Sequence, residues 1–261
     1  MDTFSWGIIG PGNIATEFAQ DLNLIKSARH RISAVLSHNL EKAAAFAAKE
    51  DAPQYFEDIT SFLQAAKVDA VYIATPHPLH YEETLRCLQH QIPVLCEKPL
   101  AMNSYQAQEM VNAAVLHHTF LMEGMWIRFL PSIRQLLSLI ENNTIGPIIS
   151  LKADLSFKAP DDPQSRYFDP ALGGGSLLDL GIYPVFLAHL LLGKPSNIQA
   201  QARLSNKQID ETCAVVLGYD NGQYALVESS LITQTERTAT IYGATGRIHI
   251  GTPGMSSHPP S

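Results

Sequence analysis

Short apolar runs alternate with segments of helical periodicity through the first half of the sequence. FSWGII (4–9) is the first run, and after it apolar residues recur at helical spacing at Ile14, Phe18, Leu22 and Ile25. Strands that alternate with helices are joined by right-handed crossovers and form a parallel sheet covered on both faces. The later runs that predict strands of this sheet are RISAVLS (31–37), DAVYIAT (69–75) and PVLCE (93–97).

The pattern changes after about residue 124, where most predicted strands follow one another with few helices between them. Asp220-Asn221-Gly222 separates two of these strands and predicts a hairpin with a type I′ turn. A chain of 261 residues also exceeds the ~100–200 residues usual for one domain. We therefore predict a doubly wound parallel α/β domain (1–124), an α+β domain with an open, mainly antiparallel sheet (125–250) and a disordered, Gly/Pro/Ser-rich tail (251–261).

Charge and targeting signals argue against several partners and locations. The chain has 18 Lys and Arg against 25 Asp and Glu, a formal charge of -7, and no long basic block, which argues against nucleic acid and anionic membranes. The N-terminus lacks the basic region of a signal peptide. The apolar segment 177–193 is interrupted by polar residues and falls short of the ~20 residues that a membrane span needs.

Three cysteines lie far apart in the sequence, at Cys87, Cys96 and Cys213. An odd number without a CxxC pair predicts neither a disulfide framework nor a cysteine metal site. We therefore expect a cytoplasmic protein.

A glycine motif of the form GxGxxA joins the first predicted strand to the first predicted helix. Gly10 permits a tight turn, Gly12 lets a pyrophosphate approach the backbone, and Ala15 allows close helix packing. The phosphates would then lie at the helix N-terminus. The alternative is a glycine-rich turn that serves packing alone.

The choice between NAD and NADP is predicted at the end of the second strand. An acid there would bind the ribose hydroxyls of NAD, but the sequence reads Leu36-Ser37-His38-Asn39. His38 and Lys42 lie one helical turn apart and, with the Ser37 hydroxyl, would hold a 2′-phosphate. We favour NADP, with NAD possible; the alternative is that both basic side chains are simply solvated.

Two further loops follow buried strands at the edge where α/β sheets bind ligands. The first is Thr75-Pro76-His77-Pro78-Leu79-His80, which we interpret as a cofactor-lining loop with His80 capping the next helix; a third metal ligand is missing, so no metal is predicted. The second is Glu97-Lys98-Pro99, which would place an ammonium group at the nicotinamide end of the cofactor.

The segment GGGSLLDLGIYP (173–184) supplies a second pair of candidate residues. Asp179 and Tyr183 are four apart and share one helix face. A neighbouring ammonium favours the phenolate form of Tyr183, which would accept the proton of a carbinol during hydride transfer. Asp179 would orient the substrate or Lys98; alternatively it completes a capping box with Ser176.

The motifs GIIGPGNIA, TPHPLH, VLCEKP, MEGMWIRFLPSIRQL and GGGSLLDLGIYP resemble, in this order and at these separations, the Gfo/Idh/MocA family of oxidoreductases. Within the family they look most like the branch with dihydrodiol dehydrogenases and NADP-dependent D-xylose dehydrogenases. The resemblance covers residues 4 to about 250. It implies an N-terminal Rossmann domain and a C-terminal sheet that often forms a dimer interface, so we expect a homodimer.

The resemblance also implies roles for individual residues. The lysine of EKP (Lys98) and the tyrosine of DxGxY (Tyr183) are then the catalytic pair, and Asp179 lies in the same site. Trp126 and Phe157 would line the substrate pocket, and Arg128 is assigned with them; the alternative for Trp126 and Phe157 is a core aromatic. The full cofactor-binding set is Gly10, Gly12, Asn13, Ile14, Ser37, His38, Lys42, Thr75, His77, His80, Glu97 and Lys98.

Three departures from the family pattern matter. Two basic residues, one helical turn apart, usually bind the 2′-phosphate in this branch. This sequence has His38 and Lys42 at these positions, which weakens the prediction of NADP. The chain also stops before family members usually do, and its tail (251–261) does not resemble their continuation, which predicts a truncated or frameshifted product. The leading hypothesis is an NADP-dependent dehydrogenase acting on a carbinol of a pyranose sugar or a cyclic trans-diol. The alternative is a cofactor-binding sensor or an inactive remnant.

Overall fold

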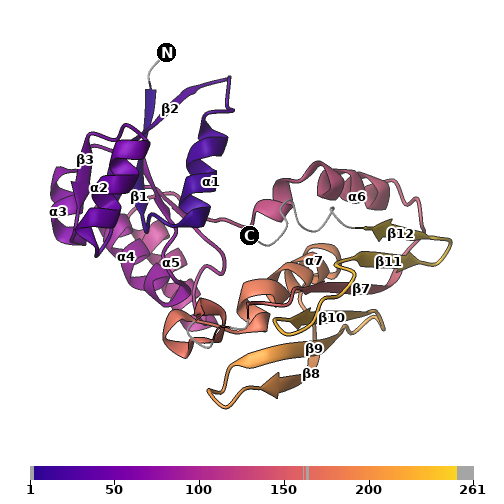
Figure 1. Ribbon diagram of the computed structural model, residues 1–261. Helices are drawn as coiled ribbons and strands as arrows, with labels where there is room; N and C mark the ends of the chain where they lie inside the picture. Colours follow the sequence, from indigo (N-terminus) through magenta and orange to yellow (C-terminus); the bar gives the residue numbers. More distant parts are fainter. Residues whose placement is uncertain (1–2, 161, 163–164, 252–261) are drawn as a thin grey trace. The chain divides into compact units, whose positions relative to one another are not determined.

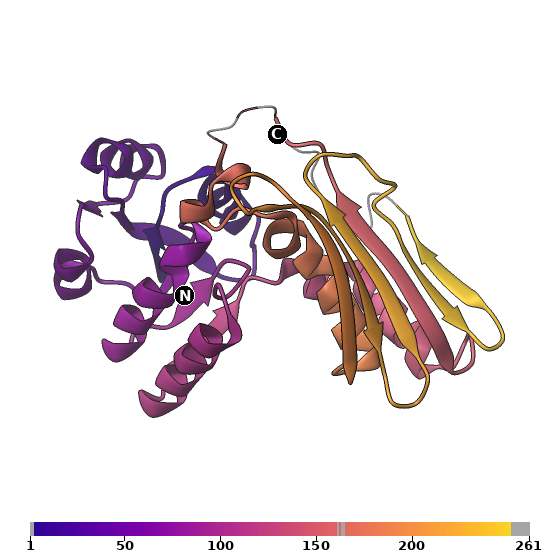
Figure 2. The same ribbon diagram turned by 90° about the horizontal axis from the view of Figure 1, so that it is seen from below.

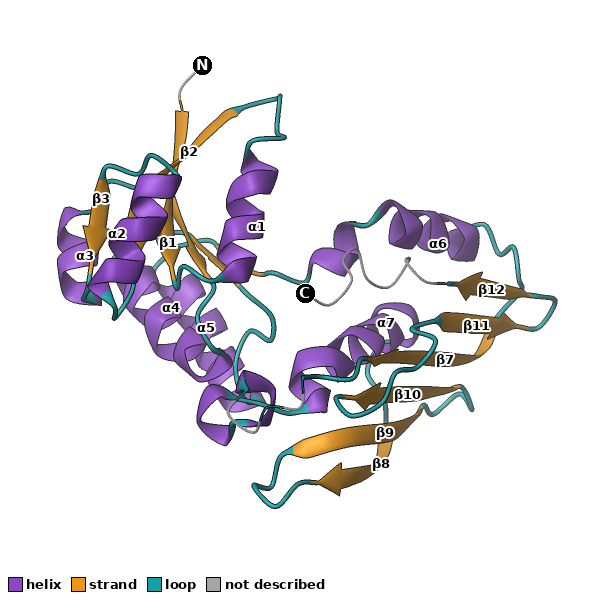
Figure 3. Ribbon diagram, viewed as in Figure 1, coloured by secondary structure: helices purple, strands orange, loops and turns teal. Residues whose placement is uncertain are grey.

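The computed structural model describes residues 3–160, 162 and 165–251. The chain divides into two compact units, Met1–Met125 (unit 1) and Trp126–Ser261 (unit 2). The predicted disordered tail, apart from Gly251, lies outside the described residues. Figure 1 labels the elements along the chain, and Figure 3 separates helices from strands.

Unit 1 is a six-stranded parallel sheet with the strand order β3-β2-β1-β4-β5-β6. This is the order of a doubly wound dinucleotide-binding fold, and it confirms the predicted parallel α/β architecture. The direction of chain progression reverses between β1 and β4, so the loops after these two strands border the crevice where such sheets bind ligands. The strands are β1 (Thr3–Ile9), β2 (Arg29–Leu36), β3 (Gln54–Phe56), β4 (Ala70–Ile73), β5 (Val94–Cys96) and β6 (Leu121–Glu123). The helices are α1 (Asn13–Leu22), α2 (Leu40–Lys49), α3 (Ile59–Ala65), η1 (His77–Leu79), α4 (His80–Gln89) and α5 (Ser104–Leu116).

Two hydrophobic clusters cover the two faces of this sheet. Ile8 packs with buried residues of α1 and α2, whereas its neighbour Ile9 packs with residues of α3, α4 and α5. Successive side chains of a strand point to opposite faces, so an unbroken apolar run suits a sheet buried on both sides.

The buried face of α1 differs from the expected one. Ile14 and Ile25 are 40% and 42% exposed, and the helix ends at Leu22, before Ile25. Its buried residues are Ala15, Ala19 and Leu22. Small alanines let this helix approach the sheet closely, which outweighs the periodicity of the larger side chains.

Unit 2 is a mixed six-stranded sheet with the order β12-β11-β7-β10-β9-β8. Strands β7 and β10 pair in parallel, while the remaining neighbours pair antiparallel, as the mainly antiparallel prediction requires. Helices α6 and α7 pack on one face of the sheet (Figure 2), where Leu136 and Leu187 join Leu151 and Val215 in one core. The strands are β7 (Ile148–Ser156), β8 (Asn197–Leu204), β9 (Asp210–Gly218), β10 (Tyr224–Ser230), β11 (Ala239–Gly243) and β12 (Arg247–Ile250). The helical elements are η2 (Trp126–Phe129), α6 (Pro131–Glu141), η3 (Arg166–Phe168), η4 (Pro170–Leu172), the π-helical turn η5 (Leu177–Gly181) and α7 (Ile182–Leu192).

The hairpin predicted at Asp220-Asn221-Gly222 joins β9 to β10, but the predicted turn type is wrong. A type I′ turn needs a positive φ at both central residues, and of these three residues Gly222 alone has one, at +84°. Its N–H donates to the Tyr219 carbonyl, and the Tyr219 N–H donates to the Gln223 carbonyl. This pattern indicates a type I turn closed by a bulge at Gly222.

One helical stretch of the described residues, Pro170–Leu192, is long and apolar enough by length and composition alone to cross a membrane. The core helix of a folded domain passes the same test. Here 44% of its most apolar window is buried inside the protein, and Leu187 and Ala188 of α7 are fully buried in unit 2.

Candidate active site

The turn after β1 brings Gly10 against the residues that follow β4. Gly10 has a φ of +85°, and its N–H donates to the Leu36 carbonyl at 3.0 Å. A Cβ at this position would lie 2.7 Å from the backbone nitrogen of Thr75 and 2.9 Å from the carbonyl carbon of Ala74. Both the dihedral angle and this close approach of two backbones therefore require glycine.

Helix α1 begins with an N-terminus that no side chain caps. Gly12 is the N-cap residue, and the first turn contains no acid. A Cβ on Gly12 would meet nothing within 4 Å, so the space over the helix end is open, and the neighbouring Asn13 and Ile14 are exposed. Uncapped N–H groups and the positive end of the helix dipole bind phosphate. This end of unit 1 fits the pyrophosphate of a dinucleotide.

Two basic side chains, His38 and Lys42, follow β2; the residues directly after the strand, Ser37-His38-Asn39, include no acid, and Glu41 is an acid in the first turn of α2. His38 and Lys42 are exposed, while Ser37 is buried and its hydroxyl accepts a hydrogen bond from the Asn39 N–H at 3.2 Å. Asn39 caps α2 by accepting from the Lys42 N–H at 2.9 Å, which fixes where the helix starts. A 2′-phosphate is bound by basic groups, whereas the ribose hydroxyls of NAD are bound by a carboxylate.

The loop after β4 is tied to α4 by a hydrogen bond between side chains. The Thr75 hydroxyl donates to Oε2 of Glu83 at 2.6 Å. Burial raises the pKa of Glu83 to about 7, although this hydrogen bond acts in the opposite direction. The same Thr75 abuts Gly10, so a group that ionises near neutral pH supports the backbone facing the glycine turn.

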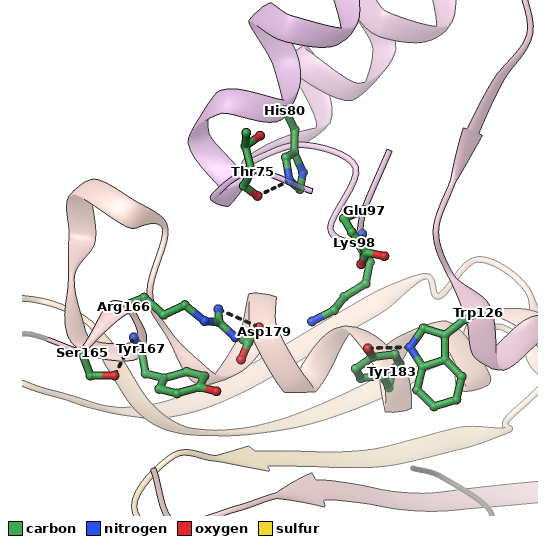
Figure 4. Close-up of polar contacts among 10 residues, drawn as sticks. All are labelled: Thr75, His80, Glu97, Lys98, Trp126, Ser165, Arg166, Tyr167, Asp179 and Tyr183. Atoms are coloured by element: carbon green, nitrogen blue, oxygen red, sulfur yellow. Dashed lines mark hydrogen bonds and ion pairs between the residues drawn. The ribbon is translucent and has the colours of Figure 1, made fainter. Parts of the chain in front are cut away.

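His80 does not cap α4 through its side chain, contrary to the prediction. It is the first residue of that helix and is fully buried, with Nδ1 2.9 Å from the Pro99 carbonyl and Nε2 2.8 Å from the Thr75 carbonyl. The ring thus bridges the loops that follow β4 and β5 (Figure 4 shows the Thr75 contact). Burial lowers the pKa of His80, and the two carbonyl oxygens oppose that shift. The ring positions these loops, and both of its nitrogens contact backbone oxygens.

The same loop contains two histidines, but the sequence offers no third ligand for a metal ion. His77 is also buried, and its ring centre lies 5.8 Å from that of His80. Among the described residues, no group of three or more His, Cys, Asp or Glu is arranged to hold a metal ion.

The EKP segment follows β5, and its glutamate is held from the neighbouring strand. The Tyr72 hydroxyl donates to Oε1 of Glu97 at 2.6 Å, and the Lys98 N–H donates to Oε2 at 3.1 Å. Burial raises the pKa of Glu97, while Tyr72 and Lys98 oppose the shift. Glu123 at the end of β6 accepts from the Leu100 N–H at 2.8 Å, so the segment is fixed on both sides of its cis Lys98–Pro99 bond. The backbone that carries Lys98 is therefore rigidly placed.

In unit 2, Tyr183 lies at the start of α7 and contacts Trp126. The indole Nε1–H donates to the Tyr183 hydroxyl oxygen at 3.0 Å, and the two rings meet edge-on at 5.8 Å (Figure 4). Tyr183 is 7% exposed. A donor to this oxygen stabilises it when it carries negative charge. The structure therefore unites Trp126 with the tyrosine of DxGxY.

Asp179 is buried in the π-helical turn η5 and pairs with an arginine that the sequence did not single out. Nη1 of Arg166 lies 3.4 Å from Oδ1 of Asp179. A π-helical turn inside a longer helix is a frequent feature of functional sites, because the extra residue re-aims the side chains around it. Asp179 and Tyr183 thus lie on one continuous helix, Asp179 in its π-helical first turn and Tyr183 in the α-helical part that follows.

The predicted capping box between Ser176 and Asp179 does not form. The Ser176 side chain caps no backbone N–H, and instead its hydroxyl donates to Oδ2 of Asp210 at 2.8 Å. The Leu177 N–H donates to the same oxygen at 2.6 Å, so an acid of β9 performs the capping. A Cβ on Gly175, whose φ is +129°, would collide with this carboxylate. Asp210 thus anchors the start of the DxGxY helix.

The remaining substrate candidates have separate surroundings. Arg128 is exposed on η2, the same short turn that carries Trp126. Phe157 is 9% exposed, and its ring packs edge-on against Tyr167 at 5.1 Å. The three cysteines are free and buried.

Two family models together match nearly the whole length of this chain. The oxidoreductase family with an NAD-binding Rossmann fold matches residues 4–125, and the GFO/IDH/MocA C-terminal domain matches residues 133–249. The chain belongs to the GFO/IDH/MocA family. This membership confirms the resemblance, and it agrees with the strand order of unit 1 and the glycine turn at Gly10.

Curated relatives of this GFO/IDH/MocA protein include two dehydrogenases. Trans-1,2-dihydrobenzene-1,2-diol dehydrogenase of Xenopus laevis is 34% identical over 247 residues, which cover 94% of this chain and 74% of the relative. The Homo sapiens protein of the same name is 32% identical over 250 residues, covering 95% and 74%. The chain thus spans about three quarters of their length.

Solved structures of this fold include a ketoreductase and an aldose oxidoreductase. KijD10, a 3-ketoreductase from Actinomadura kijaniata in complex with NADP and TDP-benzene, matches with a TM-score of 0.87 and 26% identity over 96% of this chain and 77% of its own. The aldose-aldose oxidoreductase of Caulobacter crescentus, complexed with glycerol, matches with a TM-score of 0.89 and 25% identity, covering 99% and 79%. This GFO/IDH/MocA chain is an NAD(P)-dependent oxidoreductase.

Proposed function

We propose that the protein is an NADP-dependent dehydrogenase that oxidises a carbinol of a pyranose sugar or of a cyclic trans-diol. The observation that carries this proposal is the buried Tyr183 hydroxyl, whose oxygen accepts the Trp126 indole N–H at 3.0 Å. A phenolic oxygen already supplied with a donor is prepared to take a proton from a substrate hydroxyl.

Tyr183 and Lys98 share the proton transfer in this proposal. Tyr183 takes the hydroxyl proton while the carbon–oxygen double bond forms and the carbinol hydrogen leaves as hydride. When bound, the nicotinamide ring supplies the acceptor for that hydride. The Lys98 ammonium favours the phenolate form of Tyr183, and Asp179 orients the substrate. The firm placement of the EKP backbone by Tyr72 and Glu123 supports a role for Lys98 that depends on position.

The cofactor proposal rests on the N-terminal ends of two helices in unit 1, α1 and α2. Gly10, Gly12 and the first turn of α1 would hold the pyrophosphate, and the loop at Thr75 would line the crevice beside it. The preference for NADP over NAD is supported by the exposed His38 and Lys42 and by the lack of an acid in Ser37-His38-Asn39, directly after β2. KijD10, which has the same fold, was solved with NADP.

The substrate class is supported by the relatives. The curated relatives are named for a cyclic trans-diol, and the two similar structures are named for a ketone reduction and for aldoses. The chemistry that these names share is the interconversion of a carbinol and a carbonyl group.

The deciding experiment is fluorescence titration of the 261-residue chain with NADPH and NADH, followed by assay of aldoses and trans-diols with the oxidised cofactors. Tighter binding of NADPH with turnover supports the proposal, and Lys98→Met then removes the turnover while binding persists. Binding without turnover on any substrate favours the cofactor-binding sensor or inactive remnant. If neither NADPH nor NADH binds, the proposal is wrong from its first step, the assignment of the glycine turn to the cofactor.

We also propose that the protein is a cytoplasmic homodimer that associates through the sheet of unit 2. The face opposite α6 and α7 has a shallow hollow of about 740 Å³, lined among others by Gln199, Val216, Glu228 and Tyr242. Light scattering after size-exclusion chromatography measures the mass, and a Val216→Glu variant is expected to be monomeric.

A further inference from the structure

Arg166 is held against the DxGxY segment by two glycines that precede that segment, Gly174 and Gly175. A Cβ on Gly174 would lie 2.6 Å from the Tyr167 carbonyl oxygen and 2.9 Å from that of Arg166. The Gly175 N–H donates to the Tyr167 carbonyl at 3.1 Å. Glycine is therefore required here so that the backbone around Arg166 can lie directly against the entrance to η5. This contact fixes where the Arg166 side chain begins.

The Arg166 side chain is fixed at its other end as well. Its Nη1 contacts Oδ1 of Asp179 at 3.4 Å, and the guanidinium carbon lies 4.3 Å from the centre of the Tyr167 ring. Figure 4 shows the guanidinium directed at Asp179, with Tyr167 beside it. The side chain of Arg166 is nevertheless 52% exposed, whereas that of Asp179 is 7% exposed. The arginine covers a buried acid and keeps a large part of its surface toward solvent.

The charges of this pair decide what kind of substrate group it suits. Burial of Arg166 alone would lower its pKa, but Asp179 and Tyr167 raise it, so the guanidinium stays charged. Arg166 and Asp179 together carry no net charge, so the pair gives no excess attraction for an anion. A guanidinium has five N–H groups and accepts no hydrogen bond, while a carboxylate only accepts. The pair therefore sets donors beside an acceptor.

Adjacent hydroxyl groups of a ring match this arrangement. One hydroxyl oxygen would accept from Arg166, and its O–H would donate to a carboxylate oxygen of Asp179. Tyr183 lies one helical turn further on the same helix, so the neighbouring carbinol is the one that loses its proton. A lone hydroxyl would reach Tyr183 and leave Arg166 without a substrate partner.

We propose that Arg166 is a specificity residue that makes the site select vicinal diols over isolated alcohols. This inference rests on the proposed function. It assigns the recognition of the second hydroxyl to an arginine outside the EKP and DxGxY motifs, and it makes Asp179 the partner that orients this arginine as well as the substrate.

The test compares oxidation of trans-1,2-cyclohexanediol and cyclohexanol by the NADP-loaded chain. Arg166→Met is expected to lower kcat/KM for the diol ~10- to 100-fold, mainly through KM, and to change that for cyclohexanol less than ~3-fold, because a hydrogen bond from a charged donor is lost. Arg203→Met is the matched control: Arg203 is exposed and pairs with Glu211 at 3.0 Å elsewhere in unit 2, and its loss is expected to leave both substrates unchanged.

Arg166→Lys keeps the positive charge but lacks the planar guanidinium with its paired N–H donors. If Arg166→Met fails to fold, the diol preference is measured on Arg166→Lys instead. We expect it to retain only part of the diol preference. An unchanged preference in a folded Arg166→Met or Arg166→Lys variant overturns the inference alone. A wild-type chain that binds NADPH but oxidises neither compound, nor any aldose, overturns the proposed function and the inference with it.

Discussion

The two units carry their candidate functional groups in different ways. Unit 1 uses backbone: the N–H groups at the start of α1, a glycine turn pressed against Thr75, and a histidine that contacts two carbonyls. Unit 2 uses side chains, namely Tyr183 with its Trp126 donor and Asp179 with Arg166. Backbone recognition is common to all ligands that share a phosphate, whereas side-chain recognition is specific to one substrate. Apart from changes at Lys98, changes in unit 1 should therefore affect folding and cofactor binding, and changes at these side chains of unit 2 should affect turnover.

The largest expected effect is a loss of turnover caused by a single substitution in unit 2. Tyr183→Phe removes the proton acceptor, so we expect kcat to fall ~10²- to 10⁴-fold while the dissociation constant of NADPH stays unchanged. Stopped-flow or steady-state assays and fluorescence titration measure the two quantities. Tyr224→Phe, on the exposed part of β10, is the control. A Tyr183→Phe variant within tenfold of wild-type kcat would contradict the assignment.

Unit 1 should respond through its backbone. Gly10→Ala places a Cβ 2.7 Å from the Thr75 nitrogen in a residue with a φ of +85°, so we expect the free energy of unfolding to fall by about 2–4 kcal/mol and NADPH binding to weaken. Gly222→Ala is a matched control, because its φ is +84° but its Cβ would meet nothing within 4 Å. It should cost only about 1 kcal/mol, from the dihedral angle. Urea unfolding separates the two, and equal losses would show that close packing at Gly10 is unimportant.

A smaller change should sharpen the assignment of unit 2. Trp126→Phe keeps the aromatic contact with Tyr183 but removes the indole N–H at 3.0 Å. A hydrogen bond to a charged group contributes about 1.5–3 kcal/mol, so kcat should fall roughly 10- to 100-fold. KM should change little if Trp126 acts on the tyrosine, and it should rise if Trp126 acts mainly as a wall of the substrate pocket.

The smallest expected effect is a pH dependence of stability in unit 1. The pKa of Glu83 is raised from 4.5 to about 7 in the folded protein, so the folded state holds this proton more tightly than the unfolded state. Stability is then highest below about pH 4.5 and is lost as pH rises through about 7. Glu83→Gln should remove this loss. Urea unfolding at pH 5 and pH 8 measures it, with Glu57→Gln as an exposed control.

The parts of the molecule that could be predicted from sequence are those with local signals. The order of strands and helices follows from short apolar runs, and the glycine turn is recognisable because Gly10 and Gly12 are close in sequence. The predicted type of the turn at Gly222 was wrong because the flanking strands, and not the Asn-Gly pair alone, determine which turn type forms. The apolar face of α1 was misjudged because burial there depends on how closely the alanines approach the sheet.

Contacts between residues far apart in sequence could not be predicted. Asp210 caps a helix that begins 33 residues before it, and no local pattern links the two. Arg166 carries no motif, and its relevance appears only when it lies beside Asp179. The capping box failed for the same reason, because Ser176 found a partner on β9. Local pattern shows which residues are available, and tertiary contacts decide what they do.

The buried ring of His80 has a consequence for motion in unit 1. Its two nitrogens each contact a carbonyl oxygen, one before Pro76 and one at Pro99, yet a neutral imidazole carries a single N–H. Whichever carbonyl lacks that proton is held less firmly. The tautomer of one side chain therefore decides whether the loop beside the glycine turn or the loop carrying Lys98 is the looser of the two, and exchange between tautomers would transfer mobility from one to the other.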